Sequence, residues 1–211
     1  IIYDPSKISL KISPDVVDIS YTPIIQSGGT YDIKPSAQSN EDTIKSDVIL
    51  CSLGARYKNY CANVARTFMV DPCKKMQDAY TLLLALYDSC LQKCVPGNQF
   101  NSVHAEAHEY LNKKNPEFVS YLPKSFGSST GLEFRDVSMV LNANNSNVFK
   151  EGTVINFVIG FHNIPLTSED TSKSPEAIKN LKVFSLLLAD TILIQKEGPP
   201  DILTKIGKDF T

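Results

Sequence analysis

Two β-rich runs that lead directly into an amphipathic helix constrain the fold of this chain most. Residues 47–53 (DVILCSL) and 63–70 (NVARTFMV) are rich in apolar and β-branched residues, and a polar, tyrosine-containing stretch separates them. Asp71 and Pro72 then supply an N-cap acceptor and a residue that needs no amide partner at the first helical position. We therefore expect two neighbouring strands followed at once by a helix.

The predicted helix has a single apolar stripe. Its members recur at three- and four-residue steps, and they are Met76, Tyr80, Leu83, Leu84, Tyr87, Leu91 and Cys94. The stripe ends before Pro96 and Gly97, which are typical of a helix end.

The remainder of the chain predicts more strands and one further helix. Residues 19–33 are expected to be extended, with a turn at Gly28 and Gly29 between two strands. Residues 100–114 form a more polar, peripheral helix candidate. The other segments are predicted strands at 132–141, 154–161 and 183–195, the last broken near Ala189 and Asp190, and a polar loop at 167–177. This order favours an α+β class with one core.

Composition limits the classes of function. With 211 residues, 42% of them hydrophobic, the chain is long enough to bury a genuine core. It has 21 Lys+Arg against 23 Asp+Glu, so its net charge of -2 gives no electrostatic footprint for nucleic acid or an anionic membrane. The longest apolar run, near Leu82, is far shorter than the roughly 20 residues that span a bilayer. The five cysteines are odd in number and irregularly spaced, which favours a reducing compartment, cytosolic or nuclear.

Short motifs for catalysis are weak when each is taken alone. His104 and His108 lie one helical turn apart, but Glu106 falls two positions after the first histidine, about 200° around the helix, and no third ligand is evident. A solvated helix face is the better interpretation. Cys90 and Cys94 share the apolar helix face, where free cysteine usually behaves as a small hydrophobe.

Residues 127–131 (GSSTG) match the G-x-S-x-G nucleophile elbow, which would make Ser129 the nucleophile, with Asp136 and His162 following in the order of an α/β-hydrolase. That motif needs a helix directly after the serine, whereas residues 132–141 predict a strand. A backbone turn that needs small residues is the favoured interpretation.

A longer pattern carries a family resemblance. Residues 52–68 (SLGARYKNYCANVARTF) resemble the segment that supplies the first two metal ligands in the pita-bread metallopeptidases, which include methionine aminopeptidase, aminopeptidase P and prolidase. In that family the segment is Asp-x-Gly-Ala-x-Tyr-x-Gly-Tyr-x-x-Asp, followed by an Arg-Thr-Phe-like strand. Here the frame is intact, but Ser52 stands at the first ligand position and Asn63 at the second.

The resemblance continues through three later segments. Residues 127–136 (GSSTGLEFRD) are similar to the family's Gly-His-Gly-Ile-Gly-Leu-Glu-Val-His-Glu stretch, with Ser128 at the ligand histidine and Arg135 at a second histidine that assists catalysis. Val158 and Ala189 stand at the glutamates of the last two ligand-bearing strands. The resemblance implies the pita-bread fold, an α+β architecture of curved antiparallel sheets flanked by helices.

All five ligand positions of this frame have changed. A two-metal hydrolase holds its ions with several carboxylates and a histidine, which activate water and stabilise the developing oxyanion. Serine, asparagine, valine and alanine supply neither negative charge nor imidazole. We therefore expect no catalytic metal, no cofactor and no enzyme activity.

Three segments carry a more specific resemblance. Residues 21–32 (YTPIIQSGGTYD) and 51–67 (CSLGARYKNYCANVART), with 130–135 (TGLEFR), resemble the peptidase-like domains in the large, suppressor-of-Ty subunits of FACT, a eukaryotic histone chaperone. The resemblance implies a pseudoenzyme of the nucleus and chromosome that contributes to histone and nucleosome binding in transcription, DNA replication and DNA repair. The implied partners are core histones and, through regions outside this chain, the smaller FACT subunit, with no sequence-specific DNA binding and no membrane.

The start at Ile1 and the usual presence of a preceding lobe in this family suggest that residues 1–211 are a single pita-bread lobe of a longer protein. The former active-site groove, with Ser52, Asn63, Ser128 and Arg135 as candidate lining, is expected either to hold an extended peptide such as a histone tail or to be filled, leaving an outer surface to bind. We favour the outer surface. The alternatives are a scaffold that docks other chromatin proteins and, less favoured, a cryptic hydrolase.

Overall fold

The two β-rich runs form one long hairpin in the structure, a computed structural model that describes residues 13–34, 37–39 and 42–208. Strands β3 (Val48–Tyr57) and β4 (Tyr60–Met69) pair antiparallel over their whole length. Lys58 and Asn59 close the hairpin with φ of 46° and 66°, the left-handed conformation that a tight two-residue turn demands. Apart from this two-residue turn, the polar stretch between the predicted strands is therefore strand too.

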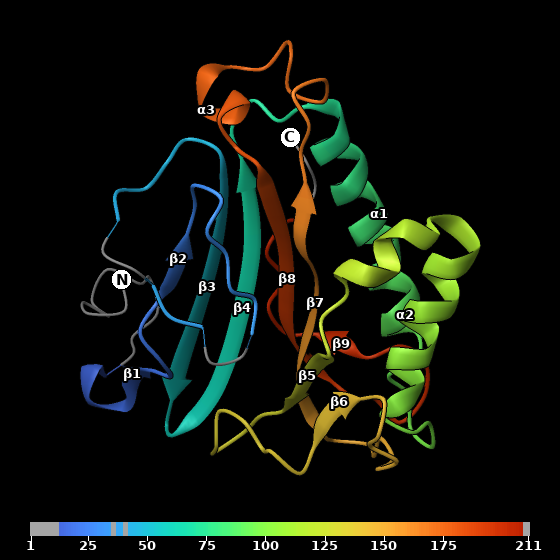
Figure 1. Ribbon diagram of the computed structural model, residues 1–211. Coiled ribbons are helices and arrows are strands. Elements are labelled where there is room, and N and C mark those ends of the chain that lie inside the picture. Colours follow the sequence, from blue (N-terminus) through green and yellow to red (C-terminus); the bar gives the residue numbers. More distant parts are fainter. Residues whose placement is uncertain (1–12, 35–36, 40–41, 209–211) are drawn as a thin grey trace.

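The hairpin is part of a nine-stranded antiparallel sheet (Figure 1). Its order is β1-β3-β4-β8-β7-β5-β6, with β2 also paired to β3 and β9 to β8. The other strands are β1 (Val17–Ile19), β2 (Ile24–Gln26), β5 (Ser125–Ser129), β6 (Val140–Asn142), β7 (Val154–Pro165), β8 (Val183–Leu193) and β9 (Asp201–Ile202). The central strands twist as they cross the molecule, which gives the sheet its curvature.

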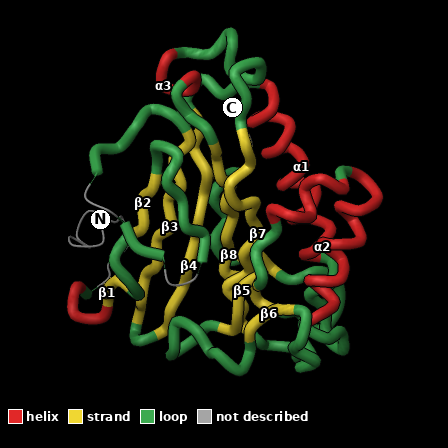
Figure 2. The backbone as a smooth tube through the Cα atoms, in the orientation of Figure 1, coloured by secondary structure: helices red, strands yellow, loops and turns green. Residues whose placement is uncertain are grey.

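Two helices, α1 (Lys74–Leu91) and α2 (Asn101–Lys114), pack on one side of the sheet (Figure 2). The Tyr87 ring of α1 lies edge-on to Phe157 of β7, with centroids 5.1 Å apart. Three short helices complete the described part of the chain, namely the 3-10 helices η2 (Pro14–Val16) and η3 (Pro116–Tyr121) and the α-helix α3 (Glu176–Lys179). The main core thus lies between the helices and one face of the sheet.

Helix α1 begins later than predicted. Cys73 is its N-cap, and Asp71 takes a φ of 46° in the turn that leaves β4. That left-handed residue reverses the chain before the helix begins, so Asp71 does not cap it. The apolar stripe itself is confirmed, because Met76, Tyr80 and Leu83 are buried.

Two strand predictions were wrong, and in both segments side-chain hydrogen bonds take the place of strand pairing. Residues 132–139 form a loop before β6, since the Asp136 carboxylate accepts hydrogen bonds from the Ser138 amide at 2.8 Å and hydroxyl at 2.7 Å. The Gly28 turn follows β2, but no second strand follows it in the residues described there. The Tyr31 hydroxyl donates to the Val48 carbonyl instead, and the Asp32 amide to the Gln26 side chain.

The predicted break in the last strand was also wrong. β8 runs unbroken through Ala189 and Asp190, because the Asp190 carboxylate is fully buried and paired with Arg66 rather than turned to solvent. The expected α+β class and curved antiparallel sheet with flanking helices are confirmed. The expectation attached to Ile1 lies outside the described residues, and the single-lobe assignment of residues 1–211 stays a prediction. No helix in the described ranges is long and apolar enough to cross a membrane.

Candidate functional site

A cavity of about 970 Å³ opens on the sheet face opposite the main helices. All five altered ligand positions line it, one from each of five strands: Ser52 (β3), Asn63 (β4), Ser128 (β5), Val158 (β7) and Ala189 (β8). Arg135 lines it as well, from the loop between β5 and β6. The structure thus brings together every residue that the sequence proposed for the site.

Strand register explains this convergence. Val158 pairs with Ala189, Ala189 pairs with Ala65, and Ala65 pairs with Ser52 in the next strand. Directly paired residues of antiparallel strands point to the same face. The alternate residues of β8 point to the other face, toward the helices, as the hydrogen bond from the Tyr87 hydroxyl to Asp190 shows.

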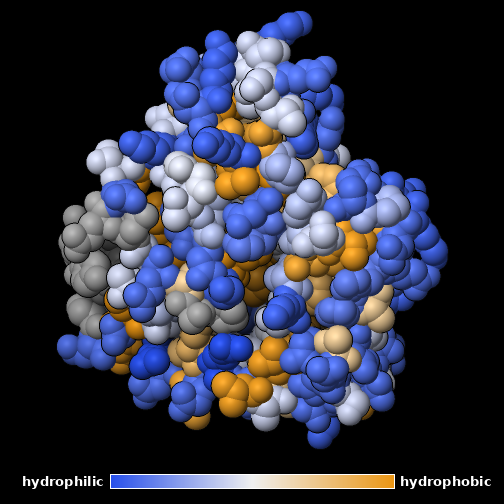
Figure 3. Space-filling model, in the orientation of Figure 1, coloured by the Kyte–Doolittle hydropathy of each residue, from blue (hydrophilic) through white to orange (hydrophobic). Residues whose placement is uncertain are grey.

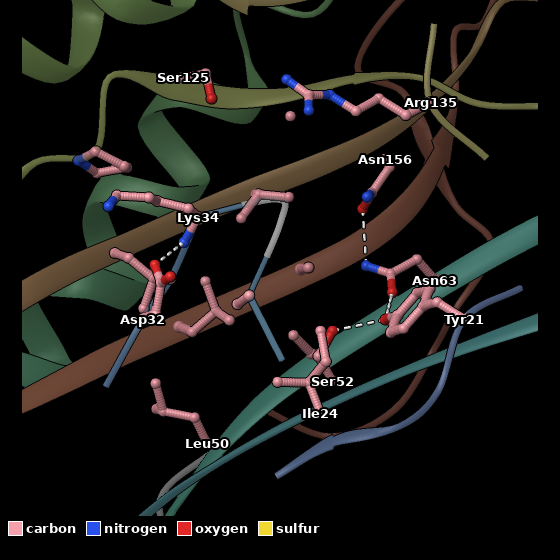
Figure 4. Close-up of a pocket in the computed structure, with 18 of the residues that line it drawn as sticks. Tyr21, Ile24, Asp32, Lys34, Leu50, Ser52, Asn63, Ser125, Arg135 and Asn156 are labelled. Carbon is pink, nitrogen blue, oxygen red and sulfur yellow. Dashed lines mark hydrogen bonds between the residues drawn. The ribbon is translucent and has the colours of Figure 1, made fainter. Parts of the chain in front are cut away.

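A chain of neutral hydrogen bonds crosses the cavity floor (Figure 4). The Tyr21 hydroxyl lies 2.7 Å from the Ser52 hydroxyl and donates to the Asn63 side-chain oxygen. The Asn63 amide nitrogen in turn donates to the Asn156 oxygen at 3.0 Å. The side chains at two of the altered ligand positions are therefore linked by hydrogen bonds through Tyr21, and no charged group takes part.

Tyr21 and Asn156 are site residues that the sequence did not identify. Tyr21 comes from the loop between β1 and β2, and its ring packs against Phe134 with centroids 4.8 Å apart. Gly54 makes this position possible, since a Cβ there would lie 2.4 Å from the Tyr21 ring. The glycine of the family motif was the available signal, but it does not identify the ring that occupies the space.

Burial raises the pKa of Tyr21 to about 12. A phenol whose folded pKa lies above its unfolded value of about 10 stabilises the fold fully below pH 10 and loses that contribution as the pH rises toward 12. We expect Tyr21→Phe to make the fall in unfolding free energy between pH 10 and 12 shallower, by up to about 1.4 kcal/mol per pH unit. Urea unfolding at several pH values measures this, with Tyr57→Phe on the exposed hairpin end as control. An unchanged slope would contradict the assignment.

Gly127 places Ser128 on the cavity side. The register of β5 shifts between Ser125 and Ser128, and Gly127 takes a φ of 106°. As a result Phe126 packs beside His104 of α2, while Ser128 pairs with Asn156 and faces the cavity. The predicted small-residue turn at 127–131 is thus in part an irregular strand.

The side chains of the cavity do not fit a divalent metal centre. Within the described ranges, no group of three or more His, Cys, Asp or Glu side chains is arranged to hold an ion. Asp32 and His162 line the cavity, but the His162 Nε2 lies 3.1 Å from the Tyr31 carbonyl oxygen. The floor offers hydroxyl and amide groups where carboxylates and an imidazole would be needed.

The other candidate motifs do not assemble into a site. Ser129 ends β5, so a strand precedes it as the elbow motif requires, but a loop follows it instead of a helix. Asp136 bonds Ser138, not His162. His104 and His108 stack on each other at 4.3 Å on α2.

The two helical cysteines are both buried. Burial raises the pKa of the Cys90 and Cys94 thiols, which keeps them protonated and unreactive. They pack in the core as small hydrophobes, as the sequence indicated.

Comparison with known proteins gives a consistent result. The model of "Metallopeptidase family M24" matches residues 7–196. The chain is 41% identical over 210 residues to the FACT complex subunit SPT16 of Arabidopsis thaliana, covering 98% of this chain and 19% of that relative. The chain therefore spans about a fifth of the length of this curated relative.

Solved structures agree with the sequence relatives. The N-terminal domain of FACT complex subunit SPT16 from chickpea superposes with a TM-score of 0.88 at 42% identity, covering 98% of this chain and 47% of that one. The prolidase of Pyrococcus furiosus has a TM-score of 0.73 at 24% identity, over 90% of this chain and 50% of that one, and shows the shared fold alone.

Proposed function

The chain belongs to metallopeptidase family M24, and from this premise we propose that it is a catalytically inactive aminopeptidase-like module of a FACT-type histone chaperone. One observation supports the proposed loss of catalysis: the five strand positions that converge on the cavity hold Ser52, Asn63, Ser128, Val158 and Ala189. None of these side chains supplies the charge that two metal ions require. The floor groups instead bond one another through Tyr21.

The module contributes to histone and nucleosome binding in transcription, DNA replication and repair, in the nucleus and on the chromosome. The similarity to SPT16 over nearly the whole chain supports this role. The smaller FACT subunit is a partner through regions outside this chain. The binding surface is on the outside of the module, because cationic side chains surround the cavity and a basic histone tail would meet like charge there.

Pull-down of core histones by the purified chain at about 0.15 M salt tests this proposal. The two types of histone pair that make up the nucleosome core are tested in separate experiments. We expect retention of at least one histone pair, with the same affinity for a Ser128→Trp variant whose cavity is blocked. Retention of neither pair would overturn histone binding and favour a scaffolding role. Loss of retention in a folded Ser128→Trp variant would move the binding surface into the cavity.

The same preparation tests for catalysis. Xaa-Pro dipeptides, aminoacyl amides and esters are incubated with the chain in the presence of Mn²⁺ or Co²⁺, with an active prolidase as positive control. We expect no turnover above buffer. Turnover that disappears in a Ser129→Ala variant would restore the hydrolase interpretation, and metal-dependent turnover would show that the altered positions still hold ions.

A further inference from the structure

The cavity has a cationic margin to which the proposed function assigns no ligand. Among the described residues that line it, three side chains are cationic, Lys34, Lys124 and Arg135, and one is acidic, Asp32. The three cations are exposed, and none makes an ion pair or a side-chain hydrogen bond within the described ranges. Among the described residues of the margin, positive charge therefore exceeds negative charge.

These cations come from three separate segments of the chain. Lys34 follows the turn after β2, Lys124 precedes β5, and Arg135 belongs to the loop after β5. Asp32 is engaged locally, since its carboxylate accepts the Lys34 backbone amide at 2.9 Å. Figure 4 shows Arg135 reaching toward Ser125, across the cavity from Ser52 and Leu50. The space-filling view shows polar side chains surrounding a hollow with apolar atoms inside it (Figure 3).

The floor holds two unused hydrogen-bond donors beside each other. Ser128 is only 4% exposed, and its hydroxyl makes no hydrogen bond in the described part of the chain. Asn156, directly paired with Ser128, accepts from Asn63 with its side-chain oxygen, while its amide nitrogen donates to no described residue. Neither the Ser128 hydroxyl nor the Asn156 amide nitrogen is among the fully buried side-chain atoms without a partner in the described part of the chain, so both are open to the cavity. The two donors are therefore available to an acceptor that enters the cavity.

The walls between floor and margin are largely apolar. Ile24, Leu50, Ala65 and Leu187 line them. A cavity of about 970 Å³ lies at the upper end of the range for pockets that hold ligands of drug size, equivalent to a few peptide residues. Apolar walls, neutral donors at the floor and cations at the margin are complementary to an extended chain of alternating apolar and acidic residues.

We propose that this cavity binds an extended peptide segment of apolar and acidic side chains. Its carbonyl or carboxylate oxygens accept from Ser128 and Asn156, and its carboxylates lie against Arg135, Lys34 and Lys124. Three cations are too few to follow a nucleic-acid backbone, where affinity grows with the number of neutralised phosphates. The site is independent of histone binding, because histone tails are basic and the proposed histone surface lies elsewhere.

Fluorescence anisotropy with labelled hexapeptides tests the proposal. The probes are Asp-Leu-Glu-Leu-Asp-Leu, its basic counterpart Lys-Leu-Arg-Leu-Lys-Leu, and a thymidine hexanucleotide, each titrated with the whole chain. We expect the acidic peptide to bind at least about tenfold more tightly than the basic one. Its affinity should fall with added salt, as exposed charge pairs do.

Variants locate the binding. Arg135→Gln and Lys124→Gln lie on the exposed margin, retain the fold, and should each weaken the acidic peptide by up to about fivefold. The matched control is Lys179→Gln on α3, an exposed lysine away from the cavity, which should change nothing. Ser128→Trp should abolish binding while histone retention persists.

The proposal would be overturned by equal binding of the acidic and basic peptides, by the hexanucleotide binding as tightly as the acidic peptide, or by affinities unchanged in both margin variants. Absence of acidic-peptide binding at any salt concentration would do the same. Because histone retention is measured on the same preparation, failure of this site is distinguishable from failure of the proposed histone-binding function.

Discussion

Asp190→Asn is expected to lower the free energy of unfolding by about 3–5 kcal/mol, the cost of breaking a buried ion pair from one side. The Asp190 carboxylate is fully buried and lies 2.8 Å from Arg66 and 3.0 Å from Lys208. The Tyr87 and Thr204 hydroxyls also donate to it, at 2.8 and 2.7 Å. The variant leaves two cations without their acidic partner in a site from which most water is excluded.

The effect extends to the last described segment. The Arg66 guanidinium also donates to main-chain oxygens, which belong to Ala65, Ala189, Ile206 and Gly207. Asp190 holds that guanidinium in place and also binds Lys208. Residues 203–208 should therefore detach first in the variant, visible as faster amide hydrogen exchange there.

Urea unfolding of Asp190→Asn beside Asp201→Asn gives the matched comparison. Asp201 pairs with Lys205 at 3.3 Å, and both side chains are largely exposed, so its loss should cost less than about 1 kcal/mol. Equal effects of the two substitutions would show that the buried network contributes nothing beyond a surface pair.

The long strands could be predicted from the sequence because their signal is local. Apolar runs defined β3, β4 and β7, and one stripe defined α1, since each of these elements buries a face that its own residues encode. The loop at 132–139 could not be predicted in this way, because the bonds from the Ser138 amide and hydroxyl to the Asp136 carboxylate are not visible in a strand-like pattern. A local preference for strand is overridden where a side chain forms a hydrogen bond with the backbone in place of the bond to a neighbouring strand.

The candidate site also has one part that the sequence predicts and one part that it does not. The positions of Ser52, Ser128 and Ala189 followed from the motif frame, because residues at matching places in paired strands face one cavity. Arg135 followed from the same frame, whereas Tyr21 and the two lysines of the cationic margin depend on which loops cross the sheet face. That arrangement depends on contacts between residues far apart in the chain. Sequence spacing does not encode such contacts.

Gly127→Ala is expected to destabilise the protein by about 2–5 kcal/mol, from two additive causes. A φ of 106° lies in the left-handed half of backbone space, where an alanine costs about 1–2 kcal/mol. A Cβ at this position would also lie 1.8 Å from the Asn156 carbonyl oxygen, in the neighbouring strand. Backbone cannot yield as a flexible side chain can, so β5 must move away from β7.

Gly152→Ala separates the two causes. Gly152 has a φ of 78°, but a Cβ there meets nothing within 4 Å, so this variant carries the conformational cost without the clash. Thermal and urea unfolding of both variants should place Gly152→Ala at about 1–2 kcal/mol and Gly127→Ala clearly above it. Equal losses would mean that β5 adjusts freely. A larger loss for Gly127→Ala, with acidic-peptide binding also lost, would show that the backbone conformation at Gly127 both keeps β5 paired with β7 and presents Ser128 to the cavity.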